Sequence, residues 1–265
     1  MRKTIFKTIA VLAGCIFVLF ACRKSVKTDT TTSDVSDEAL AKIYALGFSN
    51  KNVISDGNGN YIVEGDILLS PDDLNAVPET KFLRIGGEEQ YRTTNLVRNL
   101  PRTITVSLSS SLSTWSTALN TALSRYNALG LQIKFSRVTS GANISIVNGS
   151  GSFLASSGFP TSSGNPYNQV ILNSSAVAGQ PNNTVASILA HEIGHCIGFR
   201  HTDYMNRAYS CGGSAVNEGS AGVGAINIPG TPTGPDPNSW MLSCIGSGQD
   251  RPFNANDKIA LNYLY

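Results

Sequence analysis

Charged residues are scarce in this chain. Only 14% of its 265 residues are Asp, Glu, Lys or Arg, and the 20 cations nearly balance the 18 anions. An average soluble protein carries roughly 25% charged residues. No stretch gathers Lys and Arg into the basic face that nucleic acids require, so we expect no nucleic-acid partner.

Long apolar runs are also missing. The longest, Ile9–Ala21, has thirteen residues, fewer than the roughly 20 that span a bilayer as a helix. It follows Arg2, Lys3 and Lys7, and a basic start before a short apolar core is the pattern of a signal peptide. We expect residues 1–21 to be removed on export, which leaves 20 − 3 = 17 cations against 18 anions, a net charge near −1.

The end of this run carries a cysteine. Leu19-Phe20-Ala21-Cys22 resembles the lipobox of bacterial lipoproteins, in which the cysteine becomes acylated. Leu12-Ala13-Gly14-Cys15 matches that pattern more closely, but cleavage there would leave the apolar Ile16–Ala21 at the new terminus. We therefore expect Cys22 to anchor an exported bacterial lipoprotein to the outer membrane or the cell surface. An ordinary signal peptide and a secreted protein are the alternative.

The exported chain divides into three parts. Residues 22–36 are polar and short of apolar residues, which predicts a lipidated tether that does not fold. Residues 37–90, an accessory segment or pro-segment, predict a short helix and a β-hairpin that turns at Asp56–Asn60. Calcium is not expected at this turn, because Ile67 stands where a calcium loop needs its twelfth-position carboxylate. Residues 91–265 form the main domain.

The sequence of the main domain predicts a mixed α/β (α+β) fold. Apolar residues recur at helical spacing over residues 112–130, which predicts a long helix that backs a mixed, twisted sheet. Further helices are expected after Pro181 and from Asn254 to Tyr265. The expected strands are Thr103–Leu108, Leu131–Val138, Ile144–Val147 and Gln169–Leu172.

Histidine is scarce in this chain, and its three copies lie within eleven residues. His191 and His195 are four residues apart on one helix, so both rings can reach a single metal. Gly198 can end that helix in a left-handed conformation, after which His201 supplies a third nitrogen. Three nitrogens leave the fourth position of a zinc ion open for water, as in catalytic sites.

Glu192 lies next to the first of these histidines. Its carboxylate can accept a proton from a water whose pKa zinc lowers, which favours hydrolysis of an amide. Two alternatives remain. One is a surface-anchored binding module that keeps zinc for stability, and the other is a zinc hydrolase that acts on something other than peptides, such as a side-chain amide. A structural zinc site would need a fourth protein ligand and no base.

These residues spell HExxHxxGxxH, and the sequence resembles the metzincin clan of zinc endopeptidases. The spelling His191-Glu192-Ile193-Gly194-His195 looks like the dual-action HEIGH metallopeptidase family. The resemblance implies a metzincin-like zincin domain with a zinc helix, one catalytic Zn²⁺, a C-terminal helix, and peptide or protein substrates. Met241, forty residues after His201, matches the methionine turn that lies beneath the metal in this clan. We expect a monomer.

A second resemblance concerns residues 37–90. Ile62–Ile67 is similar to the Phe-x-Gly-Asp segment of astacin propeptides, in which the aspartate lies against the zinc in place of the catalytic water. The resemblance implies that Asp66 keeps the enzyme latent. Alternatively, Gly65-Asp66 only continues the hairpin.

Three cysteines remain in the exported chain. We hypothesise a disulfide between Cys211 and Cys244, which would clamp the insert Cys211–Asn238 between the zinc helix and the methionine turn. Cys196 lies on the helix beside a ligand, so it is expected to be a buried free thiol. We expect the insert to shape the primed side of the cleft.

Overall fold

A computed structural model describes residues 35–75, 90–219, 223–232 and 235–265. The predicted signal peptide and Cys22 lie outside the described residues, as do nearly all of the tether and residues 76–89. The chain divides into two compact units, residues 1–32 and 33–265, and every described residue belongs to the second. Within the described ranges, no helix has both the length and the apolar character needed to cross a membrane.

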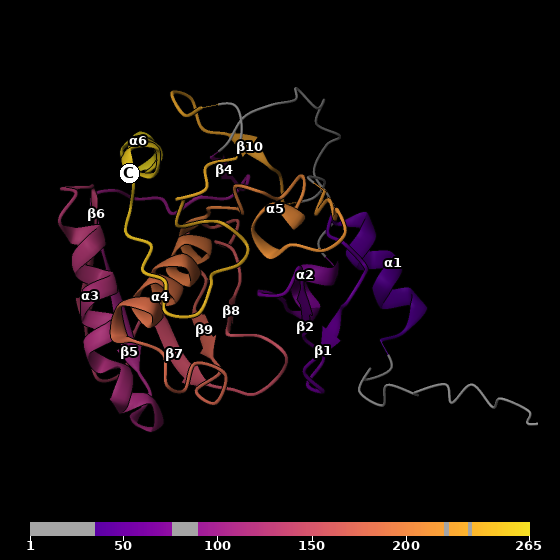
Figure 1. The fold of residues 1–265 in the computed structure, drawn as a ribbon, viewed down its shortest axis with the longest axis horizontal. Helices are drawn as coiled ribbons and strands as arrows, with labels where there is room; N and C mark the ends of the chain where they lie inside the picture. The colour runs from indigo at the N-terminus through magenta and orange to yellow at the C-terminus, as the bar shows by residue number, and fades with distance from the viewer. Residues whose placement is uncertain (1–34, 76–89, 220–222, 233–234) are drawn as a thin grey trace, which may run out of the picture. The chain divides into compact units, whose positions relative to one another are not determined.

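The described residues form an eight-stranded mixed sheet with the order β1-β2-β3-β8-β9-β7-β5-β6 (Figure 1). The strands β5, β6, β7 and β9 are mutually parallel where they pair, and β8 is antiparallel to β9. The mixed sheet of the predicted fold is thereby confirmed. The strands are β1 (Ile54–Ser55), β2 (Tyr61–Val63), β3 (Ile67–Leu69), β5 (Arg102–Leu108), β6 (Ile133–Arg137), β7 (Ile144–Asn148), β8 (Ala155–Ser157) and β9 (Gln169–Leu172).

The N-terminal segment forms the helix α1 (Asp37–Ala45), the strands β1 to β3 and the short helix α2 (Pro71–Asn75). Ser36 caps α1, because its Oγ accepts a hydrogen bond of 3.2 Å from the backbone nitrogen of Ala39. Between β1 and β2, Oδ1 of Asp56 accepts from the backbone nitrogens of Asn58 and Asn60 at 2.7 Å and 3.0 Å. The carboxylate of Asp56 thus serves the turn of the predicted hairpin.

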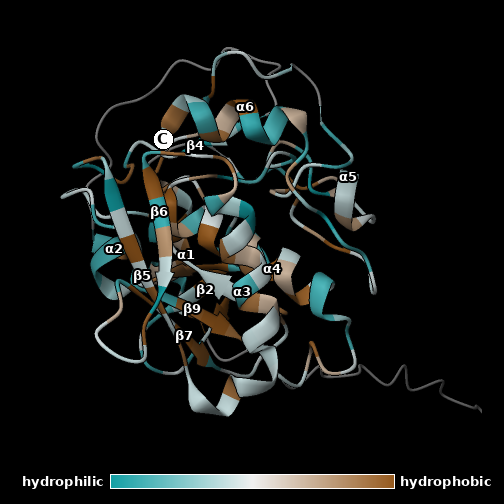
Figure 2. Cartoon of the chain, turned by 90° about the vertical axis from the view of Figure 1, so that its left-hand side faces the viewer, coloured by the Kyte–Doolittle hydropathy of each residue, from teal (hydrophilic) through white to brown (hydrophobic). Residues whose placement is uncertain are grey.

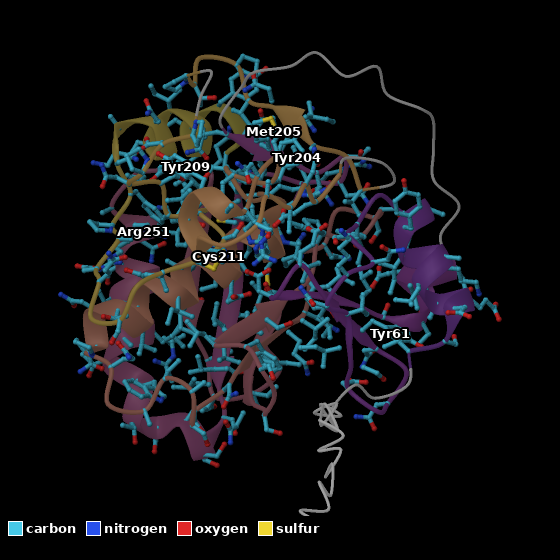
Figure 3. All side chains as sticks on the ribbon, turned by 45° about the vertical axis from the view of Figure 1, so that its right-hand side comes forward. Tyr61, Tyr204, Met205, Tyr209, Cys211 and Arg251 are labelled. Carbon is cyan, nitrogen blue, oxygen red and sulfur yellow. A yellow bond between two sulfur atoms is a disulfide. The ribbon has the colours of Figure 1, made fainter. Side chains whose placement is uncertain are left out.

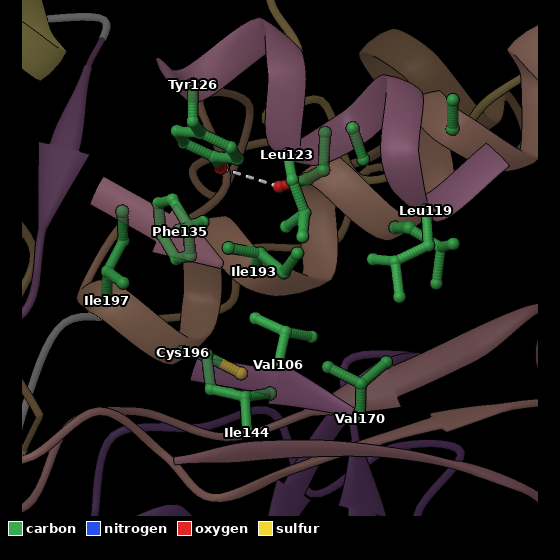
Figure 4. Packing of buried hydrophobic residues seen from close by; sticks show 14 of the residues in the cluster. Val106, Leu119, Leu123, Tyr126, Phe135, Ile144, Val170, Ile193, Cys196 and Ile197 are labelled. Carbon is green, nitrogen blue, oxygen red and sulfur yellow. Dashed lines mark hydrogen bonds between the residues drawn. The ribbon is translucent and has the colours of Figure 1, made fainter. Parts of the chain in front are cut away.

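Two helices pack on one face of the sheet and enclose the main core (Figure 4). They are α3 (Ser116–Asn127), which follows the 3-10 helix η1 (Ser110–Trp115), and α4 (Asn182–Ile197). The hydroxyl of Tyr126 on α3 donates to the carbonyl oxygen of Ala190 on α4 at 2.7 Å. Figure 2 shows hydrophobic residues concentrated in β7 and β9, whereas α6 (Ala255–Leu264) carries both hydrophilic and hydrophobic residues.

Two short structures adjoin the chain segment that follows α4. The strands β4 (Tyr91–Arg92) and β10 (Ile226–Asn227) pair as a two-stranded sheet, and α5 (Ala208–Cys211) follows the third histidine. The C-terminal helix α6 begins with a capping box, in which the side chains of Asn254 and Asp257 each accept from the other's backbone nitrogen. This confirms the predicted C-terminal helix.

The strand β8 is a feature that the sequence analysis missed. It lies in the Gly-, Ser- and Pro-rich stretch between β7 and β9, and its three residues are small. Its position matters because it joins the N-terminal hairpin to the main sheet through parallel pairing of Ile67 with Ser157. Residues 54–69 therefore share one sheet with the main domain, and the predicted division at residue 90 stays a prediction.

Candidate active site

The helix α4 fixes the positions of His191 and His195. All of its residues from Thr184 to Ile197 are buried, so the helix has little freedom to shift. It ends at Gly198, whose φ of 111° is left-handed. A Cβ at that position would lie 3.0 Å from the backbone oxygen of Asn95. Both the left-handed backbone and this close contact therefore favour glycine at position 198. The turn brings His201 back toward α4, as the spacing predicts.

The three imidazole rings converge. Nε2 of His195 lies 3.2 Å from Nε2 of His201, and the ring centroids of the three histidines lie 4.7 to 5.2 Å apart. All three side chains are buried. We name His191, His195 and His201 the three-histidine centre.

Each ring is oriented by a hydrogen bond on its other nitrogen. Nδ1 of His191 donates to the carbonyl oxygen of Trp240 at 2.9 Å, and Nδ1 of His195 donates to that of Phe199 at 2.8 Å. Nδ1 of His201 donates instead to a carboxylate, that of Glu218, at 2.9 and 3.0 Å. These partners turn all three Nε2 atoms toward the same point, as second-shell groups do in metal sites.

Asp66 completes the centre from the N-terminal hairpin. Its Oδ2 lies 3.0 Å from Nε2 of His201 and 3.5 Å from Nε2 of His191. Glu64 and Gly65, between β2 and β3, both have positive φ, 58° and 94°. Such a turn matches the twist of a tight hairpin, and it carries Asp66 to the histidines. Burial favours the neutral acid, yet the charge on His201 and the hydrogen bond from its Nε2 hold the pKa of Asp66 well below its usual range.

These four residues fit a metal ion. Their ligand atoms all lie within 4.8 Å of one another. Within the described residues, Nε2 of His191 and Oδ1 of Asp66 are buried without a hydrogen-bond partner. Buried polar atoms without a partner are rare, and an ion would satisfy them. Three imidazole nitrogens and one carboxylate oxygen are a donor set that zinc accepts in tetrahedral geometry.

Glu192 is buried beside the three-histidine centre. The hydroxyl of Ser157, on β8, donates to its Oε2 at 2.6 Å and to its backbone oxygen at 3.0 Å. Burial raises the pKa of Glu192 well above its usual range, and the charge of Asp66 adds to the rise. The missed strand β8 thus supplies the residue that holds this carboxylate in place.

Buried charges link the hairpin, the three-histidine centre and the insert. Nη2 of Arg200 lies 3.0 Å from Oε2 of Glu64, and both side chains are fully buried. Nε of Arg207 lies 3.0 Å from Oε1 of Glu218. Sequence reasoning missed Arg200, Glu64 and Glu218, because no spacing pattern ties an acid in the insert or the hairpin to His201.

Met241 lies buried against the zinc helix at Gly194. A Cβ on Gly194 would approach Sδ of Met241 to 2.6 Å and Nε1 of Trp240 to 3.1 Å. The backbone oxygen of Met241 accepts from the nitrogen of Thr202 at 2.9 Å, which ties this turn to the residue after His201. The position of Met241 is consistent with a methionine turn, whose role stays a prediction.

The disulfide between Cys211 and Cys244 is confirmed, with 5.1 Å between the Cα atoms. Cys196 is a buried free thiol, as predicted. Figure 3 shows Cys211 among the labelled residues of the segment after His201, well apart from Tyr61 on the hairpin. The bridge closes the insert into a loop that contains Glu218. A cavity of about 250 Å³ opens beside His191 and Glu192 and reaches Cys244.

The converging histidines and the adjacent glutamate define a zinc metallopeptidase. A family model described as dual-action HEIGH metallo-peptidase matches residues 61–265. The chain belongs to this family. No curated protein matches it.

Similar solved structures share little sequence identity with this chain. The structure of myroilysin is 16% identical, with a TM-score of 0.43, and covers 64% of this chain and 96% of that one. High choriolytic enzyme 1, a hatching-enzyme zinc-protease from the medaka fish Oryzias latipes, is 20% identical, with a TM-score of 0.39, and covers 61% and 88%. At these TM-scores the likeness carries no conclusion about function.

Proposed function

We propose that the protein is a zinc-dependent endopeptidase in which His191, His195 and His201 hold the metal and Glu192 is the general base. The observation that carries this proposal is the convergence of three buried Nε2 atoms beside a buried glutamate. Zinc, when bound, supplies a Lewis acid and lowers the pKa of a coordinated water toward neutrality.

The protein's own contribution to the chemistry is the placement of Glu192. Ser157 occupies Oε2, so the proton from water is accepted at Oε1. The raised pKa of Glu192 makes it a stronger base than an exposed glutamate. The same carboxyl group can then return the proton to the departing amine.

Replacement of Glu192 tests the mechanism. Glu192→Ala should keep zinc stoichiometry near one and lose hydrolysis of casein or gelatin, whereas His195→Ala should lose both. Glu38→Ala, at an exposed position on α1, is the matched control and should change neither. Substantial proteolysis by the Glu192 variant would refute the assigned base. Cleavage of small amide substrates without proteolysis would favour a side-chain amidase, and zinc binding without any hydrolysis would favour a binding module.

We further propose that Asp66 keeps the enzyme latent by taking the position of the catalytic water. Its Oδ2 lies within 3.5 Å of Nε2 of both His191 and His201. The hairpin that carries it is anchored by the buried pair of Glu64 with Arg200, next to His201. A carboxylate oxygen is a good zinc ligand, so it would exclude the nucleophile that Glu192 must activate.

Latency is tested by activity before and after removal of the hairpin. The full chain, its Asp66→Ala variant and a form cleaved to begin near Tyr91 should be compared, with Asp72→Ala on the exposed side of α2 as a control. We expect low activity in the full chain and the control, and higher activity in the other two. Equal activity in all four would leave residues 37–90 as a structural lobe.

We also propose that the protein is exported and anchored by a lipid on Cys22. The proposal is supported by the sequence of residues 1–25, which lie outside the described ranges. Metabolic labelling with palmitate should mark the wild-type chain and not Cys22→Ala. Unlabelled wild-type protein in the culture medium would favour the secreted alternative.

A further inference from the structure

The cavity beside the three-histidine centre has apolar walls and two basic residues that the proposed mechanism does not use. Its volume is about 250 Å³, and His191 and Glu192 form part of its lining. A substrate whose scissile bond lies at Glu192 would therefore place a neighbouring side chain in this cavity. The apolar lining includes Phe153, Leu154, Ile188, Leu242 and Ile245, and the basic residues are Arg207 and Arg251.

Arg251 is half-buried and has no acidic partner within 4.0 Å among the described residues. Its Nη1 donates to the backbone oxygen of Cys244 at 3.0 Å. The adjacent Asp250 is engaged by Arg125 at 2.6 Å. Asp203 accepts hydrogen bonds from neighbouring serines instead, at 2.5 to 2.9 Å. Because no acid among the described residues pairs directly with Arg251, its guanidinium can bind a carboxylate that enters the cavity.

Two other charged groups on the cavity, Arg207 and Asp66, lie close to groups of opposite charge. Arg207 lies 3.0 Å from Oε1 of Glu218. Asp66 enters from the hairpin but contacts His191 and His201. Burial lowers the pKa of Arg251 from its ordinary value while the charge of Asp203 opposes the shift, so the guanidinium stays protonated near neutral pH.

We propose that Arg251 makes the enzyme select substrates with an acidic residue, Glu above Asp, next to the scissile bond. The inference rests on the proposed endopeptidase function. A carboxylate that enters the cavity can form charge-assisted hydrogen bonds with the guanidinium. The two methylene groups of Glu pack against the apolar walls, and the shorter Asp buries less apolar surface.

A peptide library with cleavage sites mapped by mass spectrometry tests the selection. The zinc-loaded full chain is used before and after limited digestion with trypsin, which can cut after Lys81 or Arg84. We expect peptides with Glu beside the cleaved bond to be preferred over matched Gln peptides by roughly 10- to 100-fold in kcat/KM. The mapped sites also show on which side of the bond the acid lies.

Three variants separate charge from shape. Arg251→Gln should reduce the preference for Glu over Gln to about twofold or less while cleavage of the Gln peptide is retained, because only the charge is lost. Arg251→Lys should keep a reduced preference for Glu. Arg137→Gln, exposed on β6, is the matched control and should leave the ratio unchanged.

A binding measurement gives a readout without turnover. Fluorescence anisotropy on trypsin-treated Glu192→Ala protein should show tighter binding of a Glu peptide than of its Gln counterpart, and the difference should vanish in Glu192→Ala/Arg251→Gln. Peptide cleavage without an acidic preference would overturn the inference about Arg251, and so would a preference that is unchanged in Arg251→Gln. Neither result would contradict the proposed endopeptidase function. If Arg251→Gln does not fold, the cleavage profile of the wild-type protein alone tests the preference for Glu. If neither the intact nor the trypsin-treated protein cleaves any peptide, both the inference about Arg251 and the proposed endopeptidase function are overturned.

Discussion

The carboxylate of Glu218 accepts a hydrogen bond from Nδ1 of His201, and both of its oxygens lie within 3.0 Å of that nitrogen. The opposite nitrogen, Nε2, is thereby directed to His195 and Asp66. Glu218 is itself fixed by Arg207 at 3.0 Å and is fully buried. A carboxylate in this position sets the tautomer of a ligating histidine and increases its basicity.

Loss of the Glu218 carboxylate should weaken zinc binding. We expect Glu218→Gln to reduce zinc affinity by roughly 10- to 100-fold, because the amide neither fixes the tautomer nor supports the ring charge as well. Competition with a chromophoric chelator measures the affinity. Glu38→Gln, on the exposed face of α1, is the control. An unchanged affinity in Glu218→Gln would mean that Glu218 serves only the fold of the insert.

Gly194 lies where the zinc helix has no room for a Cβ. A Cβ there would meet Sδ of Met241 at 2.6 Å, so Gly194→Ala should overpack the contact and destabilise the protein by about 1 to 3 kcal/mol. The better helix propensity of alanine offsets up to about 1 kcal/mol of this cost. Urea denaturation should show a lower midpoint for Gly194→Ala than for wild type. Truncation of the methionine should relieve the clash, so Gly194→Ala/Met241→Ala should lose less than the sum of its single variants.

The disulfide should stabilise both the fold and the zinc site. Closing the loop between Cys211 and Cys244, 33 residues apart in sequence, contributes about 4 kcal/mol in the chain-entropy model. The double variant Cys211→Ser/Cys244→Ser should therefore unfold at lower temperature. Because Glu218 lies within the loop, zinc affinity should fall as well. Cys196→Ala, which removes the buried free thiol, is the control and should leave zinc affinity near that of wild type. Equal zinc affinities in all three proteins would show that the disulfide does not support the metal site.

Asp257 should make stability depend on pH. It accepts from the backbone nitrogens of Trp240 and Asn254 and from Nε2 of Gln90, yet burial raises its pKa to about 6. An unfolded aspartate titrates near pH ~3.9, so the folded protein binds this proton more tightly than the unfolded chain. The contribution of the group to the free energy of unfolding is therefore largest below about pH 4, decreases as pH rises to about 6, and is constant above.

The size of that change follows from the difference in pKa. About two pH units correspond to about 3 kcal/mol. Urea denaturation of wild type and Asp257→Asn from pH 4 to 7.5 measures it, because the variant lacks the titrating group. The difference in free energy between the two proteins should shift in favour of the variant as pH rises. A difference that moves the other way would show that the three hydrogen bonds outweigh burial.

The parts of the site that follow from local sequence were predictable. His191 and His195 share a helix whose period fixes their relation, and Gly198 marks its end. Asp66 was found only through a short resemblance, since 125 residues separate it from His191 (191 − 66). The fold class followed from the apolar periodicity of α3, α4 and the strands β5, β6, β7 and β9.

The remaining parts depend on contacts that no local pattern records. Glu218 reaches His201 across an insert with little periodicity, and Arg200 meets Glu64 136 residues away in sequence. β8 consists of Ala155, Ser156 and Ser157, residue types that do not favour strands, and its neighbours β3 and β9 hold it extended. Arg251 becomes notable only once Asp250 is seen to pair with Arg125.

The parallel pairing of β3 with β8 would affect the protein after the proposed release of the hairpin. While the hairpin is in place, the backbone nitrogen of Ser157 donates to the oxygen of Asp66 at 2.8 Å. Any event that lifts the hairpin away turns β8 from an interior strand into an edge strand with unpaired backbone groups. Such an edge recruits extended peptides, and equally a second copy of the same chain. Activation would therefore expose the protein to self-association until a substrate covers that edge.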